Sequence, residues 1–236
     1  MSFAFTPEFV AGLVLLLVAA GIVNGVAGFG FAVVGTMALA TVVDPAAAVV
    51  FLIFPILSVN LSLAGELSGE QLRTCGRRFG PLLGSAFVGT LAGMALLERI
   101  PEAPLRVGLG LVALGFVATA QRAVPVPGLS RAKDGCFVEG TVAMAGVGGI
   151  SGVLFGGTNV GVQLVAYVRS CDLSHGLFVG VVAMVFLGLN GVRIAAAGVL
   201  GLYPDATFAA ASFFAAAPAA VGVAVGARLR PKVSER

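Results

Sequence analysis

The feature that most limits how this chain can fold is a set of seven long stretches without a charged residue. They cover residues 9–43, 45–65, 79–97, 107–121, 140–168, 176–192 and 206–227. A helix needs about 20 apolar residues to cross the hydrocarbon core of a bilayer, and most of these stretches reach or approach that length. Of the 236 residues, 58% are hydrophobic and only 11% are charged, whereas a soluble domain carries about 25% charged residues. The sequence therefore predicts an all-α polytopic membrane protein and excludes a soluble enzyme or a nucleic-acid-binding protein.

Two of the stretches, 9–43 and 140–168, are too long for a single crossing. The first would extend about 52 Å as one straight helix. Each has a glycine-rich segment within it, at residues 24–30 and 151–159. We predict that each stretch forms two half-helices joined by non-helical backbone in these segments, and that the two breaks meet near the membrane centre. Unsatisfied backbone groups cannot face lipid, so the breaks are expected to line a cavity.

The placement of lysine and arginine indicates that both long stretches enter the membrane and return. If each crossed once, six positive residues would lie on one side and seven on the other, with Arg193 inside a span. If each returns, eleven share one side, and only Arg99 and Arg106 lie on the other. Cytoplasmic loops carry an excess of positive residues. We therefore predict a multi-pass protein of the cell membrane with its N-terminus outside and its C-terminus in the cytoplasm.

This topology divides the chain into two inverted repeats, each a broken-helix hairpin followed by transmembrane helices. The first repeat covers residues 1–125, with a hairpin at 9–43 and helices at 45–65, 79–97 and 101–121. A cytoplasmic linker at 126–135 precedes the second repeat at 136–236, with a hairpin at 138–168 and helices at 174–202 and 204–227.

Sequence similarity between the halves supports the repeat. The segment from Asn24 to Gly30 resembles the segment from Ser151 to Gly157, and Asn60 and Asn190 lie near the ends of the next helices. Glycine-interrupted segments at matching positions of two inverted halves are the best sequence indication of a transporter's central site. Helix N-termini at such breaks expose N–H groups and the positive end of the helix dipole, which favours an anion.

The candidate binding residues are polar side chains and glycines near the breaks and on the helices that follow. They are Asn24, Gly28, Gly30, Asn60, Ser151, Gly156, Gly157, Thr158, Asn159, Gln163, Asn190 and Arg193. Arg193, the one basic residue inside a predicted span, either balances the charge of an anion or extends to the membrane surface. The hydroxyls and amides either bind the anion or form interhelical hydrogen bonds. The spacing of the three cysteines indicates no metal site, and no cofactor is expected.

The order and spacing of these motifs resemble the sulfite exporter TauE/SafE family, also called the toluene sulfonate uptake permeases. Residues 27–32, followed by Asp44-Pro45, resemble the opening motif of one branch of the family. Four later segments resemble the closing motif of that branch: Gly156-Gly157-Thr158-Asn159, Tyr167-Val168-Arg169, Asn190-Gly191-Val192-Arg193 and Gly201-Leu202-Tyr203. The resemblance implies a secondary transporter that moves sulfite, a sulfonate or a similar organosulfur anion. The expected partners are this small anion and the lipid bilayer, with a homodimer as an open alternative to a monomer.

Two other functions are compatible with parts of the sequence. A glycine-lined cavity could conduct passively, so a passive anion channel stays open as an alternative. Gly149-Ile150-Ser151-Gly152 resembles a motif of intramembrane serine proteases, and His175 is the only histidine. A serine–histidine pair must lie within hydrogen-bond reach, yet Ser151 is predicted near the midplane and His175 at the cytoplasmic edge. We therefore expect that the protein is not an enzyme.

Overall fold

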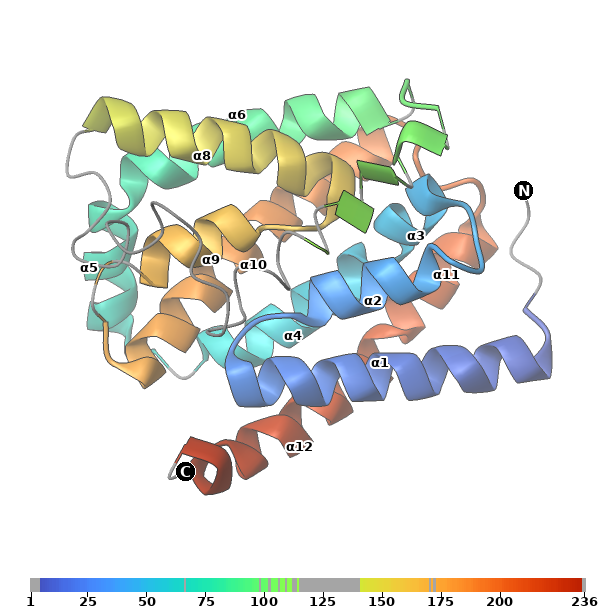
Figure 1. Cartoon of the computed structure of the whole chain (residues 1–236), viewed down its shortest axis with the longest axis horizontal. Coiled ribbons are helices and arrows are strands. Elements are labelled where there is room, and N and C mark those ends of the chain that lie inside the picture. The colour runs from blue at the N-terminus through green and yellow to red at the C-terminus, as the bar shows by residue number, and fades with distance from the viewer. Residues whose placement is uncertain are drawn as a thin grey trace.

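In the computed structural model, the described residues are 5–65, 67–97, 99–101, 103–105, 107–108, 110–111, 114, 141–169, 171 and 173–234. Their regular elements are helices (Figure 1). These are α1 (Pro7–Ala27), α2 (Phe31–Leu39), α3 (Pro45–Phe51), α4 (Ile53–Ala64), α5 (Gly69–Arg78), α6 (Gly80–Leu97), α8 (Thr141–Thr158), α9 (Val162–Arg169), α10 (His175–Val199), α11 (Ala206–Phe214) and α12 (Ala216–Ser234). Within the described ranges, five helical segments are long and apolar enough to cross a membrane. The predicted all-α membrane fold is confirmed.

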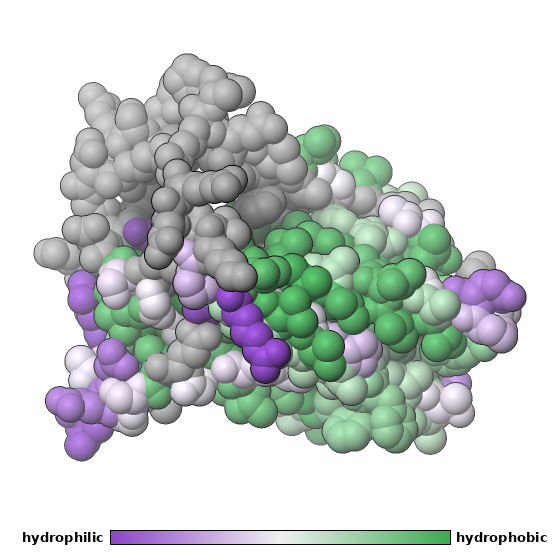
Figure 2. All heavy atoms as spheres, turned by 90° about the horizontal axis from the view of Figure 1, so that it is seen from below, coloured by the Kyte–Doolittle hydropathy of each residue, from purple (hydrophilic) through white to green (hydrophobic). Residues whose placement is uncertain are grey.

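Most of the predicted helix at 101–121, and all of the predicted linker at 126–135, lie outside the described residues. The surface of the described residues is typical of a membrane protein. Large apolar side chains such as Leu15, Val88 and Phe214 are exposed on α1, α6 and α11. Seen from below, apolar side chains cover a broad band of the molecule, with hydrophilic side chains gathered to either side (Figure 2). This distribution matches a bilayer core with polar faces on both sides.

The first long stretch breaks where its glycines require it. Helix α1 ends at Ala27, and Gly28 and Gly30 adopt φ values of 82° and 113°, which residues with a Cβ rarely adopt. Helix α2 then runs back along α1 (Figure 1). The predicted break is confirmed at Gly28–Gly30, but Asn24–Ala27 belong to the helix. Helix α1 spans 21 residues, so the hairpin joins one full-length helix to a short one instead of two equal halves.

The second long stretch also folds back, but its break lies later than predicted. Helix α8 continues through Ser151 to Thr158, and the break falls at residues 159–161, where Asn159 adopts a φ of 62°. The prediction of non-helical backbone over 151–158 is therefore wrong. The reason is that Gly152 and Gly156 lie one turn apart and pack against the backbone of Ala86 and Thr90 in α6. These two glycines allow α8 to pack closely against α6, and they do not form a turn.

Glycine contacts of this kind bind two pairs of helices. Gly21 and Gly25 of α1 face Gly222 and Gly226 of α12, and Gly89 and Gly93 of α6 face the backbone of α8. A Cβ at any of these glycines would collide with backbone atoms of the partner helix. Small residues spaced four apart allow this close approach, which drives helix association in a membrane.

The two pairs are reciprocal. In the predicted repeat scheme, α8 corresponds to α1 and α12 corresponds to α6, and the structure pairs α1 with α12 and α8 with α6. The central contact, between α4 and α10, joins two helices that also correspond. Such an exchange of contacts is what a two-fold relation between the halves would produce. The inverted repeat itself stays a prediction.

Candidate functional site at the helix breaks

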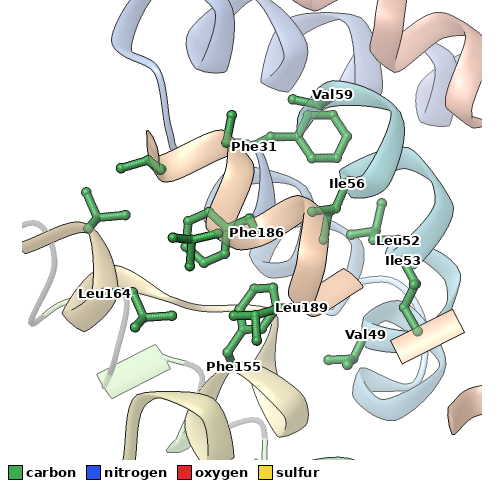
Figure 3. Packing of buried hydrophobic residues seen from close by; sticks show 14 of the residues in the cluster. Phe31, Val49, Leu52, Ile53, Ile56, Val59, Phe155, Leu164, Phe186 and Leu189 are labelled. Carbon is green, nitrogen blue, oxygen red and sulfur yellow. The ribbon is translucent and has the colours of Figure 1, made fainter. Parts of the chain in front are cut away.

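A small cavity lies where the two breaks approach each other. Its volume is about 30 Å³, enough for about two water molecules or one small ion. The lining residues come from both hairpins and from the two central helices: Asn24, Gly28, Phe29, Gly30, Phe31, Ala32, Val33, Ile56, Asn60, Phe155, Asn159, Gly161, Val162, Val165 and Phe186. Figure 3 shows Phe31, Ile56, Phe155 and Phe186 in this region. The prediction that both breaks line one cavity is confirmed.

The side chain of Asn24 organises the first break. Its Oδ1 accepts a hydrogen bond from the Phe31 N–H at 2.9 Å, and its backbone oxygen accepts one from the Gly28 N–H at 2.7 Å. Asn24 therefore stabilises both the end of α1 and the start of α2. The side chain is 5% exposed, and its Nδ2 has no hydrogen-bond partner. Because Asn24 also lines the cavity, this unpaired amide is a candidate donor for a ligand.

The cavity also receives the N-terminal turns of two helices. Ala32 and Val33 lie in the first turn of α2 and line the cavity. In this turn the Phe31 N–H donates to the side chain of Asn24, and the N-cap residue Gly30 supplies no side-chain acceptor. Val162 begins α9 and also lines the cavity. First-turn N–H groups have no acceptor within their helix and carry the positive end of the dipole. Two such turns lining one cavity supply the kind of donors that an anion site requires, and the described lining residues include no carboxylate that would repel an anion.

Asn159 links the second break to α2 and α3 by hydrogen bonds. Its Nδ2 donates to Thr36 Oγ1 and to the Val49 carbonyl, both at 3.0 Å, and the residue is fully buried. Its Oδ1 has no hydrogen-bond partner. The neighbouring hydroxyl of Thr158 donates to the Leu154 carbonyl and accepts from the Val160 N–H. Asn159 therefore lines the site, whereas Thr158 stabilises the turn behind it.

The two central asparagines bond in the same way but lie in different places. Asn60 Nδ2 donates to the Ile56 carbonyl at 2.7 Å, and Asn190 Nδ2 donates to the Phe186 carbonyl at 2.8 Å. Asn60 lines the cavity and Asn190 does not. Instead, Asn190 Oδ1 accepts a hydrogen bond from Arg193 Nη1 at 3.2 Å. The structure therefore brings Asn24, Gly28, Gly30, Asn60 and Asn159 together and leaves Asn190 outside.

Arg193 lies behind the cavity wall. It is fully buried, and its guanidinium carbon is 4.9 Å from the centre of the Phe155 ring, within the range of a cation–π interaction. Full burial contradicts the alternative that this side chain extends to the membrane surface. Arg193 does not line the cavity, so the structure does not place it in one site with the two helix N-termini.

The remaining candidates lie on α8 and α9, away from the cavity lining. Gly156 and Gly157 are inside α8, so they lie beyond the turns that have free N–H groups. Their backbone N–H groups are therefore not the free donors that a binding role for these glycines would require. Ser151 is buried within α8, and Gln163 lies in the first turn of α9 with its Oε1 buried and unpaired. His175 begins α10, and its side chain lies outside the described residues.

Sequence reasoning missed the aromatic part of the site. Phe155 and Phe186 both line the cavity, with ring centres 5.0 Å apart. Phenylalanines in apolar stretches carry no distinguishing pattern. The one signal was Gly161, where a Cβ would collide with the Phe186 ring.

Residues 13–236 match a protein-family model described as sulfite exporter TauE/SafE. No curated protein and no solved structure matches the chain. The matched range includes every residue of the cavity lining as well as Arg193.

Proposed function

Because the chain belongs to the sulfite exporter TauE/SafE family, a family of membrane transporters for sulfur compounds, we propose that it is a secondary transporter for a small sulfur-containing anion. Sulfite, sulfonates and similar organosulfur anions are the candidate substrates. One observation carries the proposal: the first turns of two helices and Asn24, whose amide Nδ2 has no hydrogen-bond partner, line the same cavity.

The chemistry of the cavity suits an oxyanion. The oxygens of a sulfite or sulfonate group accept hydrogen bonds, and the N–H groups of α2, α9 and Asn24 supply donors. None of the described lining residues carries a charge, so in this proposal the anion is held by dipoles and amides. A site of this kind binds without a fixed ion pair, which would favour release on the far side of the membrane.

Access from each side would follow from movement of the hairpins. In this proposal, α2 moves about Gly28–Gly30 and α9 about residues 159–161, while α4 and α10 stay packed at the centre. Alternating access by movement of one structural unit against another around a fixed site is common in transporters with broken helices. We further propose that the N-terminus lies outside and the C-terminus in the cytoplasm, because the positive residues gather on the C-terminal side.

Transport by purified protein in liposomes tests the proposal. Vesicles that contain the full chain should take up radiolabelled sulfite faster than empty vesicles. Unlabelled sulfite inside the vesicles should accelerate this uptake, because a carrier returns faster when loaded. Uptake without that acceleration would favour the passive channel, and uptake equal to that of empty vesicles would contradict both.

A further inference from the structure

Arg193 is a buried cation with little to balance its charge. Its side chain is fully buried, and among the described residues it makes one hydrogen bond, from Nη1 to Asn190 Oδ1. Among the described residues, Tyr203 is the group that interacts with it electrostatically, and no carboxylate does so. Burying a charge without an ionic partner is strongly unfavourable, and a cation–π contact with Phe155 offsets only part of that penalty.

The unbonded atoms of Arg193 have the geometry of an oxyanion site. Nε and Nη2 are both buried and have no hydrogen-bond partner. Their N–H groups point in the same direction along one edge of the planar guanidinium. Such an edge binds two oxygens of one carboxylate, phosphate or related group at the same time. The free edge therefore matches a sulfite ion or a sulfonate group.

Tyr203 adds a neutral donor nearby. Its hydroxyl is buried without a hydrogen-bond partner, and its ring packs against Phe54 and Phe208, with centre distances of 6.1 and 6.4 Å. Burial raises the pKa of Tyr203, and the charge of Arg193 lowers it by less. The phenol therefore keeps its proton at neutral pH and can donate it in a hydrogen bond to an anion.

Phe155 separates Arg193 from the cavity. The ring lines the cavity and at the same time contacts the guanidinium. It packs against Phe186, which lines the same wall. An anion that passes from the cavity to Arg193 must displace this aromatic pair.

We propose that Arg193 and Tyr203 form a second binding station for the transported oxyanion, separated from the central cavity by Phe155 and Phe186. The station lies toward the end of α10 that is on the same side of the molecule as the start of α1 (Figure 1). When Phe155 and Phe186 move apart, an anion bound at the Arg193 guanidinium would pass to the helix N-termini of the central cavity. This inference rests on the proposed function, because it assumes that an anion travels through the cavity.

The test compares Arg193→Gln with Arg99→Gln, which removes the same charge from an exposed residue. Sulfite binding is measured by calorimetry, and sulfite uptake is measured in liposomes. Thermal unfolding checks that each variant is folded. Arg193→Gln should keep the affinity of the cavity within threefold and reduce uptake at least tenfold, and Arg193→Lys should recover part of the uptake. Arg99→Gln should leave both measurements unchanged.

Unchanged uptake in folded Arg193→Gln protein would overturn the station. Equal loss of cavity affinity and uptake would also overturn it, because Arg193 would then belong to the cavity site. A second variant, Phe155→Ala, should speed exchange between the sites and increase uptake.

Failure of the proposed function would be recognised separately, as a wild-type protein that moves neither sulfite nor methanesulfonate. The station would then be judged by thermal unfolding with sulfate as the probe. Stabilisation by sulfate that disappears in Arg193→Gln would support an oxyanion station at this residue. No stabilisation of the wild type would overturn it.

Discussion

The side chain of Asn24 crosses the first helix break and accepts a hydrogen bond from the backbone N–H of Phe31 at 2.9 Å. One residue thereby contacts both the end of α1 and the start of α2 and also lines the cavity. The Oδ1 atom stabilises the fold by accepting this hydrogen bond. The Nδ2 atom has no hydrogen-bond partner and is the candidate donor to a ligand. Substitutions that affect the two atoms differently can separate these roles.

Replacing Asn24 with Asp should weaken anion binding while keeping the fold. Aspartate still accepts the Phe31 N–H, since it caps helices as well as asparagine does. The carboxylate adds a negative charge beside two helix N-termini, which favour its ionised form, and it would compete with the ligand. We expect sulfite affinity to fall at least tenfold, about 1.4 kcal/mol, with little change in unfolding temperature. Asn24→Ala should lower both, and retained affinity in Asn24→Asp would remove Nδ2 from the site.

Replacing Gly28 with Ala should destabilise the protein. Gly28 has a φ of 82°, and an added Cβ would collide with the Val179 side chain of α10. The backbone conformation alone costs a residue with a Cβ about 1–2 kcal/mol. Gly12→Ala is the matched control, because Gly12 lies in α1 with no atom near its missing Cβ. Thermal unfolding should show a clear loss for Gly28→Ala and none for Gly12→Ala; equal effects would be inconsistent with a strained break.

The pairing of α6 with α8 can be tested within one helix. Gly93→Ala would place a Cβ against the backbone of Val153 and Gly157, whereas Gly84→Ala meets nothing. Overpacking of this kind costs about 1–3 kcal/mol. We expect Gly93→Ala to unfold at a lower concentration of denaturing detergent than the wild type and Gly84→Ala to match it. A tolerated Gly93→Ala would mean that the two helices are not in close contact.

Asn159 should be more sensitive to alanine than to glycine. Both changes remove the hydrogen bonds to Thr36 and Val49, at about 1–3 kcal/mol for each buried group left unpaired. Alanine also strains the backbone at a φ of 62°, by about 1–2 kcal/mol. Thermal unfolding should therefore rank wild type above Asn159→Gly and Asn159→Gly above Asn159→Ala. Thr36→Val should cost less in the Asn159→Gly background than in the wild type; additive losses would argue against the hydrogen bond.

The two faces of the molecule can be assigned with single cysteines. Thr41 and Ser68 are exposed and lie in connections at opposite ends of the helices (Figure 1). In a background where Cys75, Cys136 and Cys171 are serine, a membrane-impermeant maleimide should label Thr41→Cys in intact cells. Ser68→Cys should react only after permeabilisation. The reverse pattern would invert the proposed orientation, and labelling of both in intact cells would contradict the hairpin topology.

The sequence was sufficient for the all-α membrane fold, because the bilayer dictates the length and composition of the helices that cross it. It did not predict the polar helix α5, or the division of the stretches at 45–65 and 206–227 into two helices each. The first break could also be predicted, since Gly28 and Gly30 supply the positive φ values that the turn needs. The second could not be placed, because Gly152 and Gly156 read like turn residues and in fact contact α6. Sequence alone does not distinguish a glycine needed for its φ angle from one needed for close packing.

The candidate site was predictable only in part. Asn24, Asn60 and Asn159 stood out because a buried amide in an apolar stretch requires a partner. The role of Arg193 depended on which side of α10 faces the protein, and the contribution of Phe155 depended on which helices meet at the centre. Both are tertiary relationships, so no local pattern could reveal them.

Helices α1 and α12 are each other's closest partners although they are the first and last described helices to leave the ribosome. During synthesis, Gly21 and Gly25 of α1 therefore remain without their packing partners until Gly222 and Gly226 have been inserted into the membrane. Helices α6 and α8 emerge closer together and can associate much earlier. Biogenesis would then end with the closure of the α1–α12 seam after release from the ribosome. A chain that ends before α12 would expose an unpaired glycine face, a feature that membrane quality control could recognise.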